Sequence, residues 1–220
     1  MTVITNLARI KALTENGCDI SVENVRTLMG LVSRTFKSHL VENGFNSRQV
    51  TKLTTKLRDA GRRSPPWKPH SERVPGRPQD GADGNRINRW LLDTNHKFYA
   101  TEITATLVEI KYYLQCLSME GAPALPNNDI QSCFSFILEH NVEPGLYLDP
   151  IQKTPIPLSD VINDARVIQS GHFTPLDRGG KHEPPNTFLM LARSNQLQGN
   201  LTVDELLSLM VSILQKHNRI

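Results

Sequence analysis

The chain has 220 residues, enough for one large domain or two small ones, and its 38% apolar and 21% charged content is ordinary for a soluble protein. A net charge of +3 and a pI near 8.8 permit nucleic-acid binding without requiring it. Because no apolar run approaches the roughly 18 residues of a membrane span, and the first residues lack the charged start and apolar core of a signal peptide, we expect a cytoplasmic protein with no membrane partner.

The cysteines exclude one kind of zinc site. Cys18, Cys116 and Cys133 are isolated in the sequence, so the chain lacks the two Cys-x-x-Cys pairs that hold a structural zinc ion in some proteins. Three scattered thiols in a cytosolic protein are expected to be reduced and to pack as small apolar groups.

Residues 1–61 are expected to form a helical region. Apolar residues from Ser21 to about Leu40 recur close to the spacing of one helical face. A second helix is predicted from Asn46, which opens a sequence similar to a capping box, to Gly61. Two interpretations remain: a helix-turn-helix whose second helix enters the major groove, or an ordinary helical hairpin with a solvated basic face. The basic residues of the second helix are Arg48, Lys52, Lys56 and Arg58.

Residues 62–92 differ in composition from their neighbours. Between 62 and 89 the segment is rich in proline and carries seven Lys and Arg against three Asp and Glu. It is interpreted either as an inert linker or as an extended arm that follows a DNA groove. In the second case arginines would contact phosphates or the minor groove, and Trp67 would stack on a base.

Residues 93–144 are expected to form a helical support. The segment from about 99 to 118 has apolar residues at steps of four and three, and Gly121 follows as a stop. A shorter helix is predicted after Pro126. Both helices are expected to pack together and to support a β-hairpin that starts at Gly145. Their apolar residues are Ile103, Leu107, Ile110, Leu114 and Leu117 in the first helix, and Ile130, Phe134 and Ile137 in the second.

The last part of the chain, residues 145–220, is predicted to begin with this hairpin. Residues 147–158 are extended and interrupted by three prolines, as is typical of the start of such a hairpin. Residues 167–170 begin with β-branched side chains and are predicted to form the second strand, with His172 at its end. The sequence Asp177-Arg178-Gly179-Gly180 is typical of a turn.

Two helices are expected to follow the hairpin. The first starts at Pro184-Pro185, because proline is tolerated in the first helical turn, and ends at Gly199. A capping box at Thr202–Glu205 opens the second. The residues expected to share a face are Asn186, Leu189 or Met190, and Arg193 on the first helix, with Asn195 near its end, and Leu206, Leu209, Met210 and Ile213 on the second.

Three polar residues in these elements form an ordered set with a characteristic spacing. His172 is followed 14 residues later by Asn186, and Asn195 lies 9 residues further on, with Arg178-Gly179-Gly180 between the first two. This ordered set resembles the HNH endonucleases of the ββα-metal superfamily, many of which are restriction or homing-type enzymes. The resemblance covers roughly Gly145 to Leu214, about a third of the chain. It implies an α+β fold, with a mainly helical N-terminal region and a C-terminal ββα-metal nuclease module.

The resemblance also implies how these residues hydrolyse a phosphodiester. His172 is the general base that deprotonates water, and Asn186 orients the backbone or the imidazole. Asn195 is a ligand of one hard divalent cation per site, Mg²⁺ or Mn²⁺, which prefers oxygen ligands and acts as Lewis acid and template. The side chains expected to contact DNA phosphates are Arg178, Lys181 and Arg193.

Position 171 departs from the family's pattern. Family members usually carry an acidic residue or a histidine immediately before the base, where it binds the metal, but this chain has Gly171. Three interpretations remain open: another carboxylate reaches the ion, water fills the position, or the site is catalytically weak. The candidate carboxylates are Asp149, Asp164 and Asp177.

Each of these residues also has a purely structural interpretation. His172 alone would suit a half-buried strand histidine, Asn186 a helix cap, and Asn195 a polar residue at a helix end. His182 is expected to be a solvated loop residue rather than a second base. The side chains that also fit ordinary surface charges are Arg178, Lys181 and Arg193.

We therefore expect a divalent-metal-dependent DNA endonuclease of HNH type that acts on double-stranded DNA. A type II restriction enzyme is suggested by analogy with the family, and a palindromic target would favour a homodimer. One rival is a modification-dependent, homing or phage-encoded HNH nuclease. The other is a DNA-binding regulator on an HNH scaffold that has lost its metal ligand. Gly171 supports that second rival, and the retained His172 argues against it.

Overall fold

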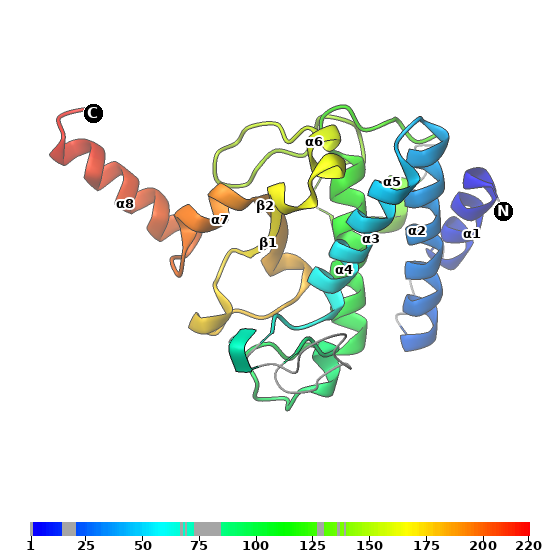
Figure 1. Ribbon diagram of the computed structural model, residues 1–220, viewed down its shortest axis with the longest axis horizontal. Helices are drawn as coiled ribbons and strands as arrows, with labels where there is room; N and C mark the ends of the chain where they lie inside the picture. The colour runs from blue at the N-terminus through cyan, green and yellow to red at the C-terminus, as the bar shows by residue number, and fades with distance from the viewer. Residues whose placement is uncertain are drawn as a thin grey trace.

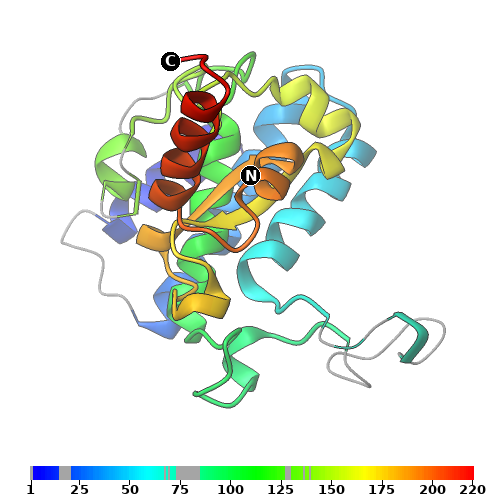
Figure 2. The ribbon, with the colours of Figure 1, turned by 90° about the vertical axis from the view of Figure 1, so that its left-hand side faces the viewer.

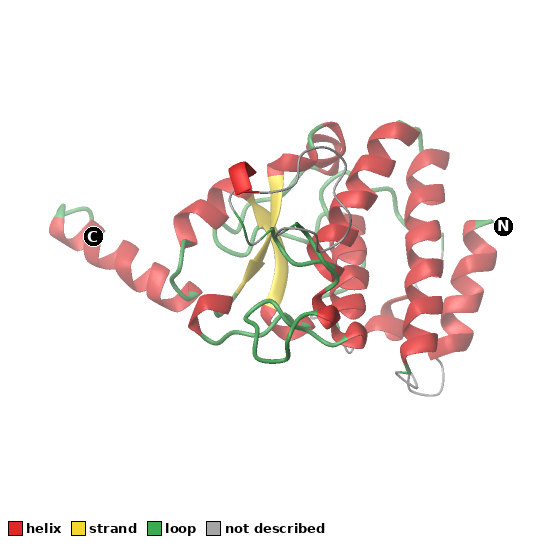
Figure 3. Ribbon diagram, turned by 60° about the horizontal axis from the view of Figure 1, so that its bottom comes forward, coloured by secondary structure: helices red, strands yellow, loops and turns green. Residues whose placement is uncertain are grey.

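Packed helices make up one half of the molecule, and a small antiparallel sheet with further helices makes up the other (Figures 1 and 3). The computed structural model is thus an α+β protein, as the sequence predicts. Within the part of the chain that is described, no helix is long and apolar enough to cross a membrane. The structure describes residues 2–14, 21–66, 68, 70–72, 85–126, 130–135, 137–138 and 140–220.

A buried helix, α4, lies at the centre of the helical half. Every residue from Ala105 to Leu117 on this helix is buried, and α2 and α3 both pack against it. A further helix, α1, covers α2 (Figure 1). The one-face apolar spacing predicted for α2 is confirmed, because its apolar stripe is buried. The bounds are Val3–Thr14 for α1, Val22–Glu42 for α2, Ser47–Arg62 for α3 and Glu102–Leu117 for α4.

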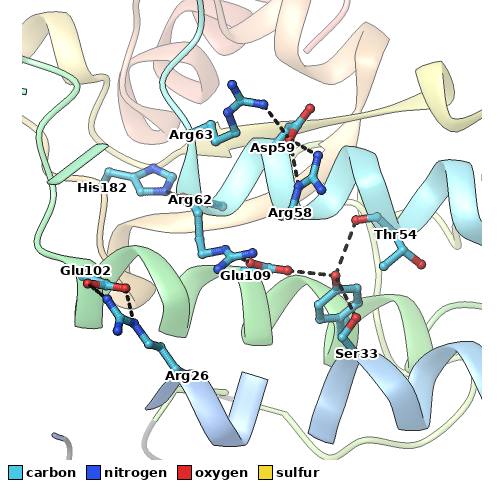
Figure 4. Close-up of polar contacts among 12 residues, drawn as sticks. Arg26, Ser33, Thr54, Arg58, Asp59, Arg62, Arg63, Glu102, Glu109 and His182 are labelled. Atoms are coloured by element: carbon cyan, nitrogen blue, oxygen red, sulfur yellow. Dashed lines mark hydrogen bonds and ion pairs between the residues drawn. The ribbon is translucent and has the colours of Figure 1, made fainter. Parts of the chain in front are cut away.

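Two ion pairs attach neighbouring helices to α4 (Figure 4). Arg26 of α2 lies 2.6 Å from Glu102. Arg62, at the end of α3, pairs with Glu109, whose side chain is 1% exposed. Burial raises the pKa of Glu109, while Arg62 and the Tyr113 hydroxyl, which donates over 2.9 Å, favour the ionised form. The last turn of α3 is therefore fixed on α4.

Asn46 is confirmed as a helix cap, although the Gln49 side chain donates to Asn163 instead of completing a capping box, and the capping box at Thr202–Glu205 is confirmed. The side chain of Asn46 accepts hydrogen bonds of 3.0 and 3.2 Å from the backbone N–H groups two and three residues further on, at the start of α3. Thr202 and Glu205 form the reciprocal contacts of a capping box. Gly199, with φ of 55°, ends α7.

The sheet consists of two strands, β1 (Ile168–His172) and β2 (Thr187–Leu191), paired antiparallel with His172 opposite Thr187. The strand predicted to end at His172 is therefore confirmed. Its predicted partner, residues 147–158, is wrong, because residues 147–157 form a loop that is held by isolated bridges and interrupted by its prolines, and residue 158 begins a helix. Two short helices flank this loop in the sequence, α5 (Ile130–Phe134) and α6 (Leu158–Asn163).

Residues 187–191 form a strand, so the predicted helix from Pro184-Pro185 is wrong. The two prolines open a 3₁₀ turn, Pro184–Asn186, and α7 begins only at Ala192. Tertiary partners explain the strand, because Gln115 accepts a 3.0 Å hydrogen bond from the N–H of Leu189 and Tyr147 donates one of 2.5 Å to its carbonyl. Asn186, Met190 and Arg193 therefore do not share a helical face.

The last two helices are α7 (Ala192–Gln198) and α8 (Val203–Lys216). In Figures 1 and 3, α8 projects away from the body, and Figure 2 views the molecule from that side. Leu206 is the buried residue of α8, whereas Leu209 and Ile213 are each 47% exposed. The predicted apolar stripe is present but largely faces solvent.

Only parts of the basic segment 62–92 are described. The N–H of Ser64 donates a 2.8 Å hydrogen bond to the carbonyl of Ile87, and Arg63 bridges to Asn88, so the two ends of the segment lie side by side. Trp67 lies outside the described residues, as does Cys18. The other two cysteines, Cys116 and Cys133, are buried free thiols as predicted.

Candidate active site

A cleft of about 980 Å³ lies between α3 on one side and, on the other, α7 and the hairpin that β1 and β2 form. It brings together His172, from the end of β1, and Asn195, from α7, as the sequence predicts. The facing wall is basic. Its charged residues are Lys52, Lys56 and Asp59 from α3, with Arg63, Arg86 and Arg89 from the segment that follows.

Contacts at the end of β1 fix the backbone of His172 and account for the glycine at position 171. The side chain of Gln198 on α7 donates a 2.7 Å hydrogen bond to the carbonyl of His172, which fixes the strand end against α7. A Cβ at position 171 would lie 2.7 Å from Cε2 of Phe188 and closer still to Sδ of Met190. Packing of these two side chains against β1 therefore favours glycine at the position where HNH endonucleases carry a metal ligand.

The side chain of Asn186 closes the loop between the two strands. Its oxygen accepts a 2.8 Å hydrogen bond from the N–H of Thr174, and its amide donates to the carbonyls of Thr174 at 3.0 Å and Lys181 at 2.8 Å. Gly180 permits this clasp, since a Cβ there would collide with the Thr174 carbonyl and lie 2.9 Å from the Asn186 amide. Asn186 thus fixes backbone, the kind of role that the sequence predicts for it.

Asn195 lines the cleft and carries an amide oxygen that can bind a further partner. Its nitrogen donates a 2.6 Å hydrogen bond to the side-chain oxygen of Gln169 on β1. This contact fixes the amide orientation, so Oδ1 is the atom left for another partner, and it accepts no hydrogen bond from the described residues. An oxygen donor is what a hard cation requires of a ligand at this position.

His182 is a buried residue, so its prediction as a solvated loop residue is wrong. Its side chain is 1% exposed, and Nδ1 lies 3.1 Å from Nε2 of His172. Its other ring nitrogen, Nε2, lies 2.7 Å from the carbonyl oxygen of Gly61 at the end of α3. The sequence carries no local signal for this burial, because its cause is a contact with a residue 121 positions away.

The environment keeps both histidines neutral. Burial, with a smaller contribution from the charge of Arg89, lowers the pKa of His172 to about 4. Burial also holds the pKa of His182 well below its usual value, and the nearby Arg89 and His172 act in the same direction. A neutral imidazole carries a lone pair, so His172 is in the protonation state that a base requires.

Arg89 is a functional candidate that sequence reasoning missed. Its residue is 4% exposed, it lines the cleft, and burial lowers its pKa to about 10. Nη1 donates a 3.1 Å hydrogen bond to the carbonyl of Phe98, while Nε is buried without a hydrogen-bond partner among the described residues. The guanidinium therefore places positive charge beside His172, in a segment where composition predicts only a general basic excess.

The three candidate carboxylates differ in their partners. Asp149 is fully buried and accepts four hydrogen bonds, from Ser194 and from the backbone N–H groups of Ile151, Gln152 and Leu191, so it has a structural role. Asp164 is bound by Arg166, chiefly through side-chain hydrogen bonds, which lowers the pKa of its carboxyl to about 2. Asp177 lines the cleft and lies 2.5 Å from Lys97. Among the described residues, no three His, Cys, Asp or Glu side chains cluster as a metal site would.

The predicted phosphate-binding residues do not line the cleft. Arg178, Lys181 and Arg193 are exposed, and Arg178 pairs with Glu205 of the α8 capping box. Of the four basic residues predicted on α3, Lys52 and Lys56 line the cleft with His172, whereas Arg48 and Arg58 do not.

Comparisons with known proteins give little beyond this geometry. No protein-family model matches the chain, and no curated protein matches it. One solved structure that resembles it is described as a type II restriction endonuclease, with a TM-score of 0.47 and 20% sequence identity. The likeness covers 56% of this chain and 56% of that chain, so the matched part spans little more than half of either. At this TM-score the likeness assigns neither a family nor an activity.

Proposed function

We propose that this protein is a divalent-metal-dependent DNA endonuclease of the HNH type, which hydrolyses phosphodiester bonds in double-stranded DNA. The observation that carries the proposal is the shared position of His172 and Asn195 on one wall of a basic cleft. Both come from one strand–loop–strand–helix unit, β1 to α7, whose loop is clasped by Asn186. The same order of elements is expected of the module that the sequence resembles.

His172 is proposed as the general base. Its neutral imidazole takes a proton from water while the water oxygen forms a bond to phosphorus and the bond to the departing sugar oxygen breaks. Arg89, together with Lys52 and Lys56 on the facing wall, offsets the negative charge of the phosphate during this step. The protein thus supplies a base on one wall and fixed positive charge on the other.

A hard cation fits the oxygen donors that line the cleft. Asn195 offers an amide oxygen and Asp177 a carboxylate, and Mg²⁺ commonly keeps several waters beside one or two protein oxygens. When bound, Mg²⁺ or Mn²⁺ supplies Lewis-acid charge to the leaving oxygen. One ion per site is proposed, held by Asn195 with Asp177 in place of the ligand that Gly171 cannot provide.

The wider functional assignment follows from the same site. A type II restriction enzyme that works as a homodimer on a palindromic target is proposed, with the exposed cations Arg178, Lys181 and Arg193 on phosphates outside the cleft. A homing, phage-encoded or modification-dependent nuclease would use the same site on another target. The alternative from a different class is a DNA-binding regulator. The lack of a ligating side chain at Gly171 favours this alternative, whereas a cleft-lining, neutral His172 does not.

Cleavage of phage and plasmid DNA tests the proposal. Purified protein with Mg²⁺ or Mn²⁺ is expected to give discrete fragments, and both His172→Ala and a chelator are expected to abolish them. His217→Ala is the matched control, since His217 is exposed at the end of α8. DNA that stays intact under every condition, with modified bases included, would favour the binding-only alternative.

A further inference from the structure

We propose that His182 is a positioning residue that fixes the tautomer of His172, so that Nδ1 of His172 carries the lone pair used as the base. The inference deepens the proposed nuclease function and rests on it for its catalytic meaning. It depends on two hydrogen bonds that connect the end of α3 to the end of β1, through His182 in the loop between the strands.

The first hydrogen bond determines the tautomer of His182. The carbonyl oxygen of Gly61 can only accept, so the Nε2 atom that lies 2.7 Å from it must carry the hydrogen. This carbonyl is available because the helical partner that would donate to it is residue 65, and Pro65 has no N–H. The sequence at the end of α3 therefore leaves an acceptor for His182.

The position of that carbonyl is itself fixed. A Cβ on Gly61 would lie 2.7 Å from Cα of Glu109, so only glycine allows α3 to approach α4 this closely. The next residue, Arg62, pairs with Glu109, and His182 lies beside this end of α3 (Figure 4). The acceptor thus belongs to a turn of α3 that is packed closely against α4.

The second hydrogen bond then determines the tautomer of His172. A neutral His182 with hydrogen on Nε2 has a bare Nδ1, which can only accept. The atom 3.1 Å away is Nε2 of His172, which must then donate. Nδ1 of His172 is left with its lone pair, and it makes no hydrogen bond with the described residues. Gly61, His182 and His172 thus form one directed chain of hydrogen bonds.

Nitrogen-15 NMR of the imidazole rings tests this chain in the intact protein without requiring cleavage. We expect both His172 and His182 to show the Nε2–H tautomer, and the Nε2–H proton of His172 to be protected from exchange with solvent. In His182→Phe this protection is expected to be lost. Nδ1–H on either residue of the wild-type protein, or a His172 signal unchanged in the variant, would overturn the proposal.

A matched control separates positioning from stability. His39 is also buried, at 5% exposure, and its Nε2 lies 3.1 Å from the carbonyl oxygen of Pro123. Neither residue lines the cleft. His39→Phe removes a similar buried contact and is expected to leave the His172 signals unchanged. Loss of the His172 protection in this variant as well would assign the effect to general destabilisation and overturn the proposal.

Kinetics then tests the catalytic meaning. His182→Phe is expected to lower kcat roughly 10- to 100-fold with KM little changed, as is typical when a residue that orients a functional group is lost. His182→Gln, which offers both a donor and an acceptor, is expected to recover part of that loss. If wild-type protein cuts no DNA while the NMR result holds, the proposed function fails and the directed chain stands. If it cuts DNA and the tautomer is mixed, the chain fails alone.

Discussion

His172, which is half-buried, and the buried His182 make the folded state sensitive to acid. His172 has its pKa lowered from 6.5 to about 4, by burial first and by Arg89 second. Between these values the unfolded chain binds a proton that the folded chain does not, so the free energy of unfolding falls as pH falls from about 6.5 towards 4. At about pH 5 this one residue lowers it by up to about 2 kcal/mol relative to pH 8.

Urea denaturation at the two pH values measures this effect. We expect His172→Gln to lose less stability on acidification than the wild-type protein, because glutamine does not titrate. His217→Gln, changed at an exposed position, is expected to follow the wild-type protein. The same acid sensitivity in His172→Gln would show that other groups cause it.

Packing at Gly171 predicts a cost for any side chain there. Gly171→Ala places a methyl group against Phe188 and Met190 and is expected to destabilise the protein by about 1–3 kcal/mol, the usual cost of overpacking. Gly30→Ala is the control, because a Cβ there lies 3.5 Å from the flexible Arg34 side chain and alanine favours helix. Thermal unfolding compares the two. Equal stability of both variants would mean that the hairpin yields at position 171.

The site could be predicted from sequence only as far as local signals reach. The spacing of His172, Asn186 and Asn195 predicted one shared site in which the middle residue fixes backbone. His172 and Asn195 do line the same cleft, and Asn186 does bind the loop backbone. Gly61 and Arg89 are different, because each acts on a histidine far along the chain, Gly61 on His182 and Arg89 on His172. No local sequence pattern indicates such a contact.

At the scale of elements, helix α3 forms a basic wall of the cleft. Lys52 and Lys56 line it, and burial lowers the pKa of Lys56, an effect that the nearby Asp164 partly offsets. Each lysine that contacts a phosphate releases a counterion, so Lys52→Ala and Lys56→Ala are each expected to weaken DNA binding and to reduce the salt slope by about 1.

Fluorescence anisotropy on one duplex over a range of salt concentrations measures these slopes. Lys216→Ala is the control, since Lys216 is exposed at the end of α8 and outside the cleft. All three variants reducing the slope equally would indicate a diffuse charge effect, and none of them reducing it would remove α3 from the DNA-binding surface.

The elements also differ in how well local sequence specifies them. α3 and α8 carry capping residues at their first turns, and both start where the sequence predicts. Residues 187–191 carry Leu and Met, which suit a helix, yet they form β2 because β1, Gln115 and Tyr147 supply hydrogen bonds to their backbone. Tertiary partners override propensity where the segment is buried on both sides.

At the scale of the whole molecule, the helical half does more than support the hairpin. α4 fixes α3 through Glu109, α3 supplies the Gly61 carbonyl and the basic wall, and the hairpin supplies His172 and Asn195. The cleft therefore forms only when both halves are packed together. Residues from both the helical region and the last part of the chain are therefore needed to build the site.

One cleft with one His172 per chain predicts how two DNA strands are cut. Under the proposed function a double-strand break needs two attacks, so a homodimer is expected to convert supercoiled plasmid directly to the linear form. Mixing wild-type protein with excess His172→Ala is expected to yield dimers with one active cleft, which release nicked circles. Agarose gels resolve the three forms. Nicked circles accumulating with wild-type protein alone, at every concentration, would instead indicate a monomer that cuts one strand per encounter.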